Sequence, residues 1–523
     1  MKRNEKTIRT VNVKRNLIYG VLQFIVSHIF PFILRTILIY RFGAEYLGLN
    51  SLFTSVLSVL SLMDLGFGTA VVYSMYKPVA EDDKELICAY LTYYRRIYRW
   101  VGLSILVVGL LVMPILKSFI KDPVLPGGLN LYVCYLIFLG NVVISYLLFG
   151  YLTAIPTAYQ RRDILSRVSM LISVLSCAVR STVLICSDNF YLYLLAMPVL
   201  TIIHNLLNAY VITKRYPDLR CSGEISIEQK KDLKIKVYGI VINRLTNVSR
   251  NSIDSICISA FIGLAMTGVY NNYYFIMSTV QSCFMMITQS MIASIGNSIA
   301  TESREKNYSD MRLFDFIFMA FAGLAAVCML CLYQPFISVW IGNKMMLKLP
   351  VVIAFCIYFY VLESGAIQWQ YHQGAGLWYE CRHMMIGETI ANVGLNIVLC
   401  RELGVFGIVL ATVLSVFVTN TFLFPRVLFQ EYFRNGKLEE YWRDHAGYWG
   451  TMIITAGLCW LLCQGLLPVS MIVEKEISNS ILCLGGRLLI CCSGSVVIFW
   501  FIWHKTQRYT NAINWLNQVV KAK

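Results

Sequence analysis

Long, uninterrupted apolar runs constrain the fold of this 523-residue chain more than any other feature. A helix needs about 20 apolar residues to cross the hydrocarbon core of a bilayer. Apolar residues make up 57% of the chain and charged residues 14%, against about 45–50% and about 25% in soluble domains. The sequence therefore predicts an all-α integral membrane protein. A soluble enzyme, a nucleic-acid-binding protein and a disordered scaffold are excluded as descriptions of the whole chain.

Fourteen runs are long enough to be transmembrane helices, and we expect two six-helix lobes around a central cavity followed by two extra C-terminal helices. The connecting loops are too short to fold on their own, so the function must lie within the bilayer. The expected spans are 17–40, 49–76, 100–116, 130–153, 166–186, 191–213, 237–262, 267–296, 313–340, 350–374, 384–400, 405–425, 447–468 and 483–503. The expected parts are a basic N-terminus (1–16), an N-lobe (17–213), a linker (214–236), a C-lobe (237–425), a second linker (426–446), helices 13 and 14 (447–503) and a C-terminus (504–523).

Basic residues indicate how these helices are oriented. With the N-terminus inside, the loops on the cytoplasmic side carry 33 Lys and Arg, and the opposite loops carry 7. Cytoplasmic loops of membrane proteins carry such an excess. We therefore expect a multi-pass protein of the bacterial cell membrane with both termini cytoplasmic. This asymmetry accounts for most of the net charge of +16 without any nucleic-acid partner.

A shift of 220 positions brings two segments into register. Gly43 and Gly48 align with Gly263 and Gly268, and both pairs fall on short outer turns, after the first and the seventh span. A shift by six spans preserves orientation, so the two halves would be parallel repeats about an axis along the membrane normal. Parallel halves with a binding site between them are a known plan for transporters.

Charged residues inside the spans are the main candidates for a site. An Arg or Asp at the centre of a transmembrane helix costs about 2.5–3.5 kcal/mol, and such residues usually face an interior cavity. Arg487 lies near the outer end of its span, so we expect it to reach the interface. The residues of this class are Arg35, Arg180, Arg244, Arg250 and Arg487 among the bases, and Asp64, Asp254, Glu363 and Glu388 among the acids.

Helical spacing groups some of these residues with other polar side chains. His28, Pro31 and Arg35 lie at i, i+3 and i+7, on one face of the first span. Arg250 and Asp254 are i, i+4 neighbours in the seventh span and form either a structural pair or part of the site. Arg35 either lines the cavity or extends to the outer interface. The expected substrate-binding residues on the seventh span, besides Arg250, are Arg244, Asn247 and Asn251.

All five intramembrane bases are Arg, although 20 of the 45 basic residues in the chain are Lys. The planar guanidinium group matches the oxygens of a phosphate, stays charged and is less strongly hydrated than an ammonium group. The bias favours a ligand that carries phosphate or pyrophosphate. Asp64, Asp254, Glu363 and Glu388 are candidates for H⁺ or Na⁺ coupling or gating, and the two glutamates are equally compatible with helix packing.

The 17 Cys do not predict a disulfide framework, because most lie inside apolar runs, where Cys behaves as a small apolar residue. No CxxC pair stands near a His and no HExxH motif occurs, so no metal site and no resident cofactor are expected.

Three segments resemble the Wzx-type flippases of bacterial polysaccharide repeat units. Residues 46–83, with YLGLNSLF and DLGFGTA, resemble the second-helix region of that family. Residues 243–276 resemble the seventh and eighth helices, which carry a base ten positions before an Asp, here Arg244 and Asp254. Residues 376–415 resemble the eleventh and twelfth helices. Arg180 and Arg250 match no motif of the family.

The resemblance implies membership of the multidrug/oligosaccharidyl-lipid/polysaccharide (MOP) exporter superfamily. It implies two lobes that open alternately around a central cationic cavity. The implied cargo is an undecaprenyl-pyrophosphate-linked oligosaccharide, moved from the inner to the outer leaflet for capsule, O-antigen or exopolysaccharide synthesis. The implied partners are the lipid bilayer and, in the same process, a polysaccharide polymerase and glycosyltransferases.

Other functions compete with this interpretation. A cation or drug antiporter of the MATE type would favour an acidic or aromatic cavity. A lipid II flippase would differ only in its cargo. A membrane enzyme such as an O-antigen polymerase or ligase would carry a large outer loop, whereas the longest outer loop here is 469–482. We therefore expect a transporter without catalytic residues.

Overall fold

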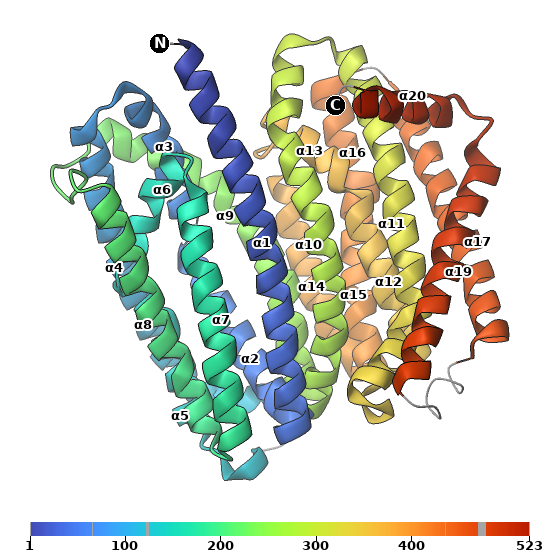
Figure 1. The fold of residues 1–523 in the computed structure, drawn as a ribbon, viewed down its shortest axis with the longest axis horizontal. Helices are drawn as coiled ribbons and strands as arrows, with labels where there is room; N and C mark the ends of the chain where they lie inside the picture. The colour runs from blue at the N-terminus through green and yellow to red at the C-terminus, as the bar shows by residue number, and fades with distance from the viewer. Residues whose placement is uncertain (1, 65, 122–124, 435, 469–476, 522–523) are drawn as a thin grey trace. The chain divides into compact units, whose positions relative to one another are not determined.

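The computed structural model describes residues 2–64, 66–121, 125–434, 436–468 and 477–521. Its described residues form helices and turns with no strand, which confirms the all-α membrane fold (Figure 1). The chain divides into two compact units, 1–268 and 269–523, which are described separately. The predicted lobe and linker boundaries stay predictions.

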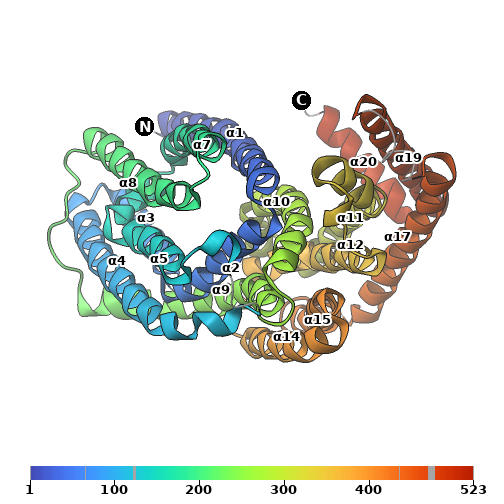
Figure 2. The same cartoon turned by 90° about the horizontal axis from the view of Figure 1, so that it is seen from below.

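Unit 1 consists of long helices joined by short turns. Seen end-on in Figure 2, α1, α2, α5, α7 and α8 form a ring, and α1 packs along α7 while α8 packs against α5 and α7. Helix α5 and the short α6 after it form one bent pair. The helices are α1 (Lys2–Phe42), α2 (Ala44–Leu60), α3 (Phe67–Glu81), α4 (Lys84–Val112), α5 (Leu131–Leu147), α6 (Ala154–Ala158), α7 (Arg162–Cys186), α8 (Phe190–Arg215) and α9 (Ile227–Phe261).

Unit 2 is also helical. Helix α11 packs against α12, α17 and α19, and α14 forms an antiparallel hairpin with α15. Gly404 makes the hairpin turn at φ 61° and ψ −137°, a conformation open to glycine but not to residues with a Cβ. The helices are α10 (Leu264–Thr301), which begins in unit 1, α11 (Arg304–Ile341), α12 (Leu349–Ser364), α13 (Ala366–Ala375), α14 (Arg382–Leu403), α15 (Val405–Val418), α16 (Phe424–Val427), α17 (Leu438–Leu466), α19 (Ile477–Trp503) and α20 (Gln507–Lys521).

The number of spans differs from the prediction. Among the described residues, eleven helices are long and apolar enough to cross a membrane, and the bent pair of α5 and α6 makes twelve. Fourteen spans are therefore not confirmed. Within the described residues, no single helix meets these criteria over 49–76 or 237–262, although α9 runs through the second range. The first is split into α2 and α3 by a 3₁₀ turn at Ser61–Asp64 and by Gly66, which has a left-handed conformation at φ 71°. In the second, only Ser252–Phe261 qualifies, as a shorter apolar helix.

Several helices extend beyond the expected spans because polar residues cap them. Helix α4 begins at Lys84 rather than near residue 100, since the side chain of Asp83 accepts a hydrogen bond from the backbone N–H of Leu86. Helix α9 begins at Ile227 with a capping box formed by Ser226 and Gln229. Segments expected as cytoplasmic loops are therefore partly helical.

The glycines of the 220-residue repeat contact each other. A Cβ on Gly48 would overlap the carbonyl oxygen of Leu264, and a Cβ on Gly268 would overlap that of Ala44. Ala44 and Leu264 are themselves 220 residues apart, so each segment makes the same contact with the other. Such reciprocity is the mark of a two-fold relation. It is what the parallel repeat predicts, and small residues at both crossings let the helix backbones approach closely.

Candidate functional site

A stripe of residues on α1 forms one wall of a cavity in unit 1. Ser27, Pro31 and Arg35 lie at i, i+4 and i+8, so they share one face of the helix. Pro31 has no backbone N–H, which leaves the carbonyl of Ser27 without its usual helical partner. Helix α1 nevertheless continues through Pro31 to Phe42. The stripe therefore offers the cavity a guanidinium group, a hydroxyl and a backbone acceptor.

A second polar stripe lies on α7. Ser169, Ser173, Ser176 and Arg180 recur at intervals of three or four residues and all line the same cavity. The rest of the wall comes from α2 and α8. The lining residues are Ser27, Phe30, Pro31, Leu34, Arg35, Leu38, Leu47, Asn50, Ser169, Ile172, Ser173, Ser176, Arg180, Tyr193 and His204, and they enclose about 420 Å³.

The Arg180 guanidinium group is held by an aromatic ring. Its central carbon lies 4.3 Å from the centre of the buried Tyr193 ring, a cation–π contact. The Nε atom of Arg180 is buried without a hydrogen-bond partner. On α2, Oδ1 of Asn50 is likewise buried and unpaired. Buried polar groups are normally hydrogen-bonded, so these two atoms are exceptions, and both belong to residues that line the cavity.

The cavity is cationic. Arg35 and Arg180 line it, and no acidic residue is among its described lining residues. His204 also lines the cavity, and its Nε2 lies 3.4 Å from Oγ of Ser169. Arg35 lies seven residues before the end of α1 and Arg180 six before the end of α7, so both are roughly 9–11 Å inside the helix ends. The structure therefore places two of the five predicted arginines, Arg35 and Arg180, in the lining of one cavity, although they are 145 positions apart in the sequence.

His28, Arg250 and Asp254 are not among the described residues that line this cavity. The ring of His28 lies next to Ser27, and its Nδ1 is 2.8 Å from the carbonyl oxygen of Phe24 on the same helix. Asp254 is buried on α9, and Arg250 is partly buried one turn before it. Their roles stay predictions. The side chains of Asp64, Arg244, Asn247 and Asn251 lie outside the described residues.

The two intramembrane glutamates of unit 2 differ in their surroundings. Glu388 accepts a hydrogen bond of 2.6 Å from the hydroxyl of Thr419. It begins a buried row with Asn392 and Asn396 on α14, and Asn392 donates to Thr412 on α15. Glu363 is 3% exposed, and no hydrogen bond to its carboxylate is seen within the described part of the chain. Glu388 thus takes part in hydrogen bonding between helices, and its role in ion coupling stays a prediction.

The expectation that Arg487 extends to the interface is wrong. Its side chain is 1% exposed. It donates hydrogen bonds to the carbonyl oxygens of Leu467 and Cys331, at 2.6 and 2.8 Å. The last carbonyls of α17 have no partner within their own helix, and Arg487 supplies one. The sequence places Arg487 near the end of its own span, but it does not show that the end of α17 lies beside it.

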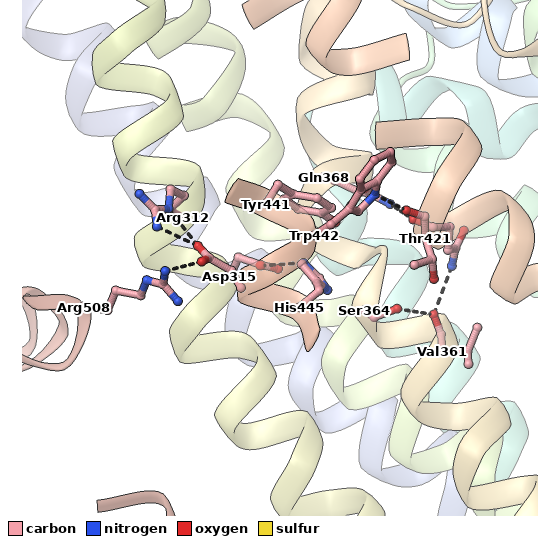
Figure 3. Close-up of polar contacts among 12 residues, drawn as sticks. Arg312, Asp315, Val361, Ser364, Gln368, Thr421, Tyr441, Trp442, His445 and Arg508 are labelled. Carbon is pink, nitrogen blue, oxygen red and sulfur yellow. Dashed lines mark hydrogen bonds and ion pairs between the residues drawn. The ribbon is translucent and has the colours of Figure 1, made fainter. Parts of the chain in front are cut away.

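A network of charged residues in unit 2 was not predicted from the sequence. Arg312 on α11 donates to Asp444 on α17 at 2.7 Å, and Arg508 on α20 pairs with the same carboxylate. One turn along, Oδ2 of Asp315 lies 2.9 Å from Nε2 of His445. Figure 3 shows Arg312, Asp315, His445 and Arg508 in this arrangement. Asp315 falls inside the expected span 313–340, so its charge was a signal that could have been used.

The sequence analysis also missed the serines of α7 and the ring of Tyr193. The four-residue and three-residue steps from Ser169 to Arg180 were visible as a polar stripe in an apolar span. A single serine in a span carries little information, however, because its hydroxyl can bond to a carbonyl of its own helix.

Comparisons with known proteins agree with this architecture. Neither a protein-family profile nor a curated protein matches the sequence. Among solved structures, the chain is similar to an inward-facing multidrug-resistance transporter of the MATE family. The TM-score is 0.63 at 14% identity, over 81% of this chain and 99% of that chain. The lipid II flippase MurJ, in an inward-closed conformation, has a TM-score of 0.64 at 12% identity, over 93% of this chain and 98% of that chain.

The chain has the fold of MOP-superfamily transporters. A transporter of this superfamily from Pyrococcus furiosus, described by the reversed polarity of its binding pocket, is also similar. Its TM-score is 0.55 at 15% identity, over 82% of this chain and 96% of that chain. At these identities the likeness shows the fold alone. The cavity of unit 1 must therefore be interpreted from its own residues.

Proposed function

We propose that this protein is a flippase that moves undecaprenyl-pyrophosphate-linked oligosaccharide repeat units from the inner to the outer leaflet. The observation that carries the proposal is that Arg35 and Arg180 line the same cavity, whose described lining contains no acidic residue. Guanidinium groups donate paired hydrogen bonds to phosphate oxygens. The serines and the Ser27 carbonyl suit the hydroxyls of a sugar. The MATE- and MurJ-like transporter fold supports the class of function.

In the proposed cycle, the cavity replaces the hydration that a pyrophosphate group loses on leaving water. Preorganised cationic donors do this at less cost than mobile groups. The polyprenyl tail stays in the lipid throughout. With a membrane potential that is negative inside, outward movement of an anion is favoured by about 2.3 kcal/mol per charge per 100 mV. Asp64, Asp254, Glu363 and Glu388 are the proposed residues for coupling the return step to H⁺ or Na⁺.

Two related functions are less well supported. A MATE-type antiporter of organic cations would place its cargo beside two arginines, and like charges within a low-dielectric cavity repel. The two arginines of the cavity suit a lipid II flippase as well as they suit the favoured function. The structural match with MurJ extends over 93% of this chain. Lipid II is therefore the second cargo to test.

The proposal is tested in proteoliposomes that hold a fluorescent undecaprenyl-pyrophosphoryl oligosaccharide. We expect Arg35→Ala and Arg180→Ala each to slow flipping about 10- to 100-fold, since a hydrogen bond to a charged group contributes about 1.5–3 kcal/mol. Arg180→Lys should restore only part of the rate, because Lys keeps the positive charge but lacks the paired N–H donors of the guanidinium group.

The matched control is Arg41→Ala. Arg41 lies six residues after Arg35 on α1 but pairs with Asp188 at the surface, at 2.7 Å. The Arg41→Ala variant should flip cargo at the wild-type rate. Wild-type flipping by Arg35→Ala and Arg180→Ala would contradict the proposal. Faster flipping of lipid II than of the oligosaccharide would favour the second cargo, and ion-driven uptake of an organic cation instead would favour the antiporter.

A further inference from the structure

Three helices of unit 2 bring cysteines to one place. Cys328 and Cys331 lie one turn apart on α11, Cys459 and Cys463 lie one turn apart on α17, and Cys491 lies on α19. Side chains three or four positions apart share one face of a helix. These three helices pack against one another, so the cysteine faces meet.

The thiols of Cys331, Cys463 and Cys491 form the centre of this cluster. Their three Sγ atoms lie within 4.8 Å of one another, and each residue is at most 1% exposed. Cys328 packs against the same cluster. Val327, Trp460 and Ile490 pack around the cluster and give it an apolar shell.

Arg487 places a positive charge beside these thiols. It lies one turn before Cys491 on α19 and donates to the backbone carbonyls of Cys331 and Cys463 themselves, at 2.8 and 3.5 Å. No carboxylate within the described residues pairs with it. A buried charge is costly unless an opposite charge compensates it. A thiolate formed in the cluster would supply that charge.

We propose that Cys331, Cys463 and Cys491 bind one thiophilic d¹⁰ metal ion, Zn²⁺ or Cu⁺. Thiolate ligands select these ions over harder cations. Metal–sulfur bonds of about 2.3 Å place bound sulfurs roughly 3.8–4.0 Å apart, and small side-chain adjustments reach this from the observed spacing. Cys328 stands beside the site as a fourth sulfur.

The charges of the bound state balance. Zn²⁺ displaces three thiol protons to solvent and forms a Zn(SR)₃ unit of charge −1, which Arg487 neutralises. Cu⁺ displaces two protons and forms a Cu(SR)₂ unit of charge −1, with the third thiol left protonated. Neither reaction needs an oxidant or a reductant. Because metal ligands must be deprotonated, binding should release protons and weaken as the pH falls.

The site lies near the end of a helix. Cys463 is three residues before the end of α17, so it lies roughly 5 Å from that end. An ion bound there would link α11, α17 and α19 close to this helix end.

The test uses the full-length protein in detergent, reduced with a phosphine and dialysed separately against Zn²⁺ and Cu⁺. We expect one ion per chain by mass spectrometry of the metal, for at least one of the two ions. Cys463→Ser and Cys491→Ser should lower the amount bound at least tenfold. Cys134→Ser is the matched control, because Cys134 is equally buried but lies on α5 in unit 1. It should bind like the wild type.

A second readout needs no variant. Zn²⁺ should slow the alkylation of Cys331, Cys463 and Cys491 in the wild-type protein, measured under partly denaturing conditions because these thiols are at most 1% exposed in the folded state. It should leave the labelling of Cys186 and Cys283, which are exposed, unchanged. The proposal is overturned if the folded wild type retains neither ion, if Cys463→Ser and Cys491→Ser bind as much as Cys134→Ser, or if metal leaves the three thiols as reactive as before.

Discussion

Polar residues lie inside both units, but they are used differently. In unit 1, Arg180 and Asn50 keep buried polar atoms without partners, and both line a cavity. In unit 2, Arg312 and Arg487 are bonded to a carboxylate or to backbone carbonyls. The same residue type thus lines a cavity in one unit and bonds helices to each other in the other. A charge inside a membrane helix is a functional candidate until its neighbours are known.

The largest effect on stability should come from the network of unit 2. Asp444→Ala removes the carboxylate shared by Arg312 and Arg508, and it leaves Arg312 with its second ion pair, to Glu440 at 2.8 Å. We expect a loss of about 2 kcal/mol in the free energy of unfolding, below the about 3–5 kcal/mol of a buried pair whose remaining charge has no other partner. Thermal unfolding in detergent measures it. Asp310→Ala is the control, because its partner Lys306 is mostly exposed and such pairs contribute at most about 1 kcal/mol. Equal losses for both variants would contradict the account.

Arg180→Ala in unit 1 should show the opposite pattern. The substitution removes a cation that lines a cavity and loses the contact with the buried Tyr193 ring, and such contacts contribute about 0.5–1 kcal/mol when exposed and about 2 kcal/mol when desolvated. Removing the cation also ends the cost of holding it away from water, so the unfolding temperature should fall less than in Asp444→Ala, while flipping is slowed. A loss of stability as large as that of Asp444→Ala would mean that Arg180 is a packing residue.

The polar row between α14 and α15 should contribute less. Asn392 donates to Thr412 and Ser415, and both hydroxyls also donate to carbonyls of their own helix. Interhelical hydrogen bonds in membrane proteins contribute about 0.6 kcal/mol on average. Asn392→Leu should lower the unfolding free energy by about that amount and leave flipping unchanged. A slower flipping rate would instead assign this row to transport.

The smallest effect concerns the loop 216–226 of unit 1. Lys84 and Arg96 pair with Asp218 and Glu224, and hydrogen bonding to these bases lowers the pKa of both carboxyl groups below their usual 3.8 and 4.5. Because the folded-state pKa is lowered, the stabilisation is present at neutral pH and lost as the pH falls below about 4. The protection of this loop against hydrogen exchange, relative to the intrinsic exchange rate at each pH, should fall in acid. The Asp218→Asn, Glu224→Gln double variant should show low protection at both pH values, and equal protection of the variant and the wild type at neutral pH would contradict this role.

The sequence predicted the fold better than the site. Apolar runs and basic loops predicted the helical membrane fold, and the reciprocal contacts of Gly48 and Gly268 agree with the predicted repeat. Arg35 and Arg180 were identified as intramembrane cations, but their meeting depends on how α1 and α7 pack, which spacing along one helix does not reveal. Arg487 was misassigned for the same reason, since its partners are carbonyls 20 and 156 positions away.

The central claim is that the cavity of unit 1 binds the pyrophosphate group of the cargo. Calorimetry with a short-chain prenyl-pyrophosphoryl sugar, titrated into purified wild-type, Arg180→Ala and Arg41→Ala proteins, tests it most directly. The account predicts equal binding by wild type and Arg41→Ala, and binding at least tenfold weaker by Arg180→Ala. The same affinity in all three proteins would contradict it.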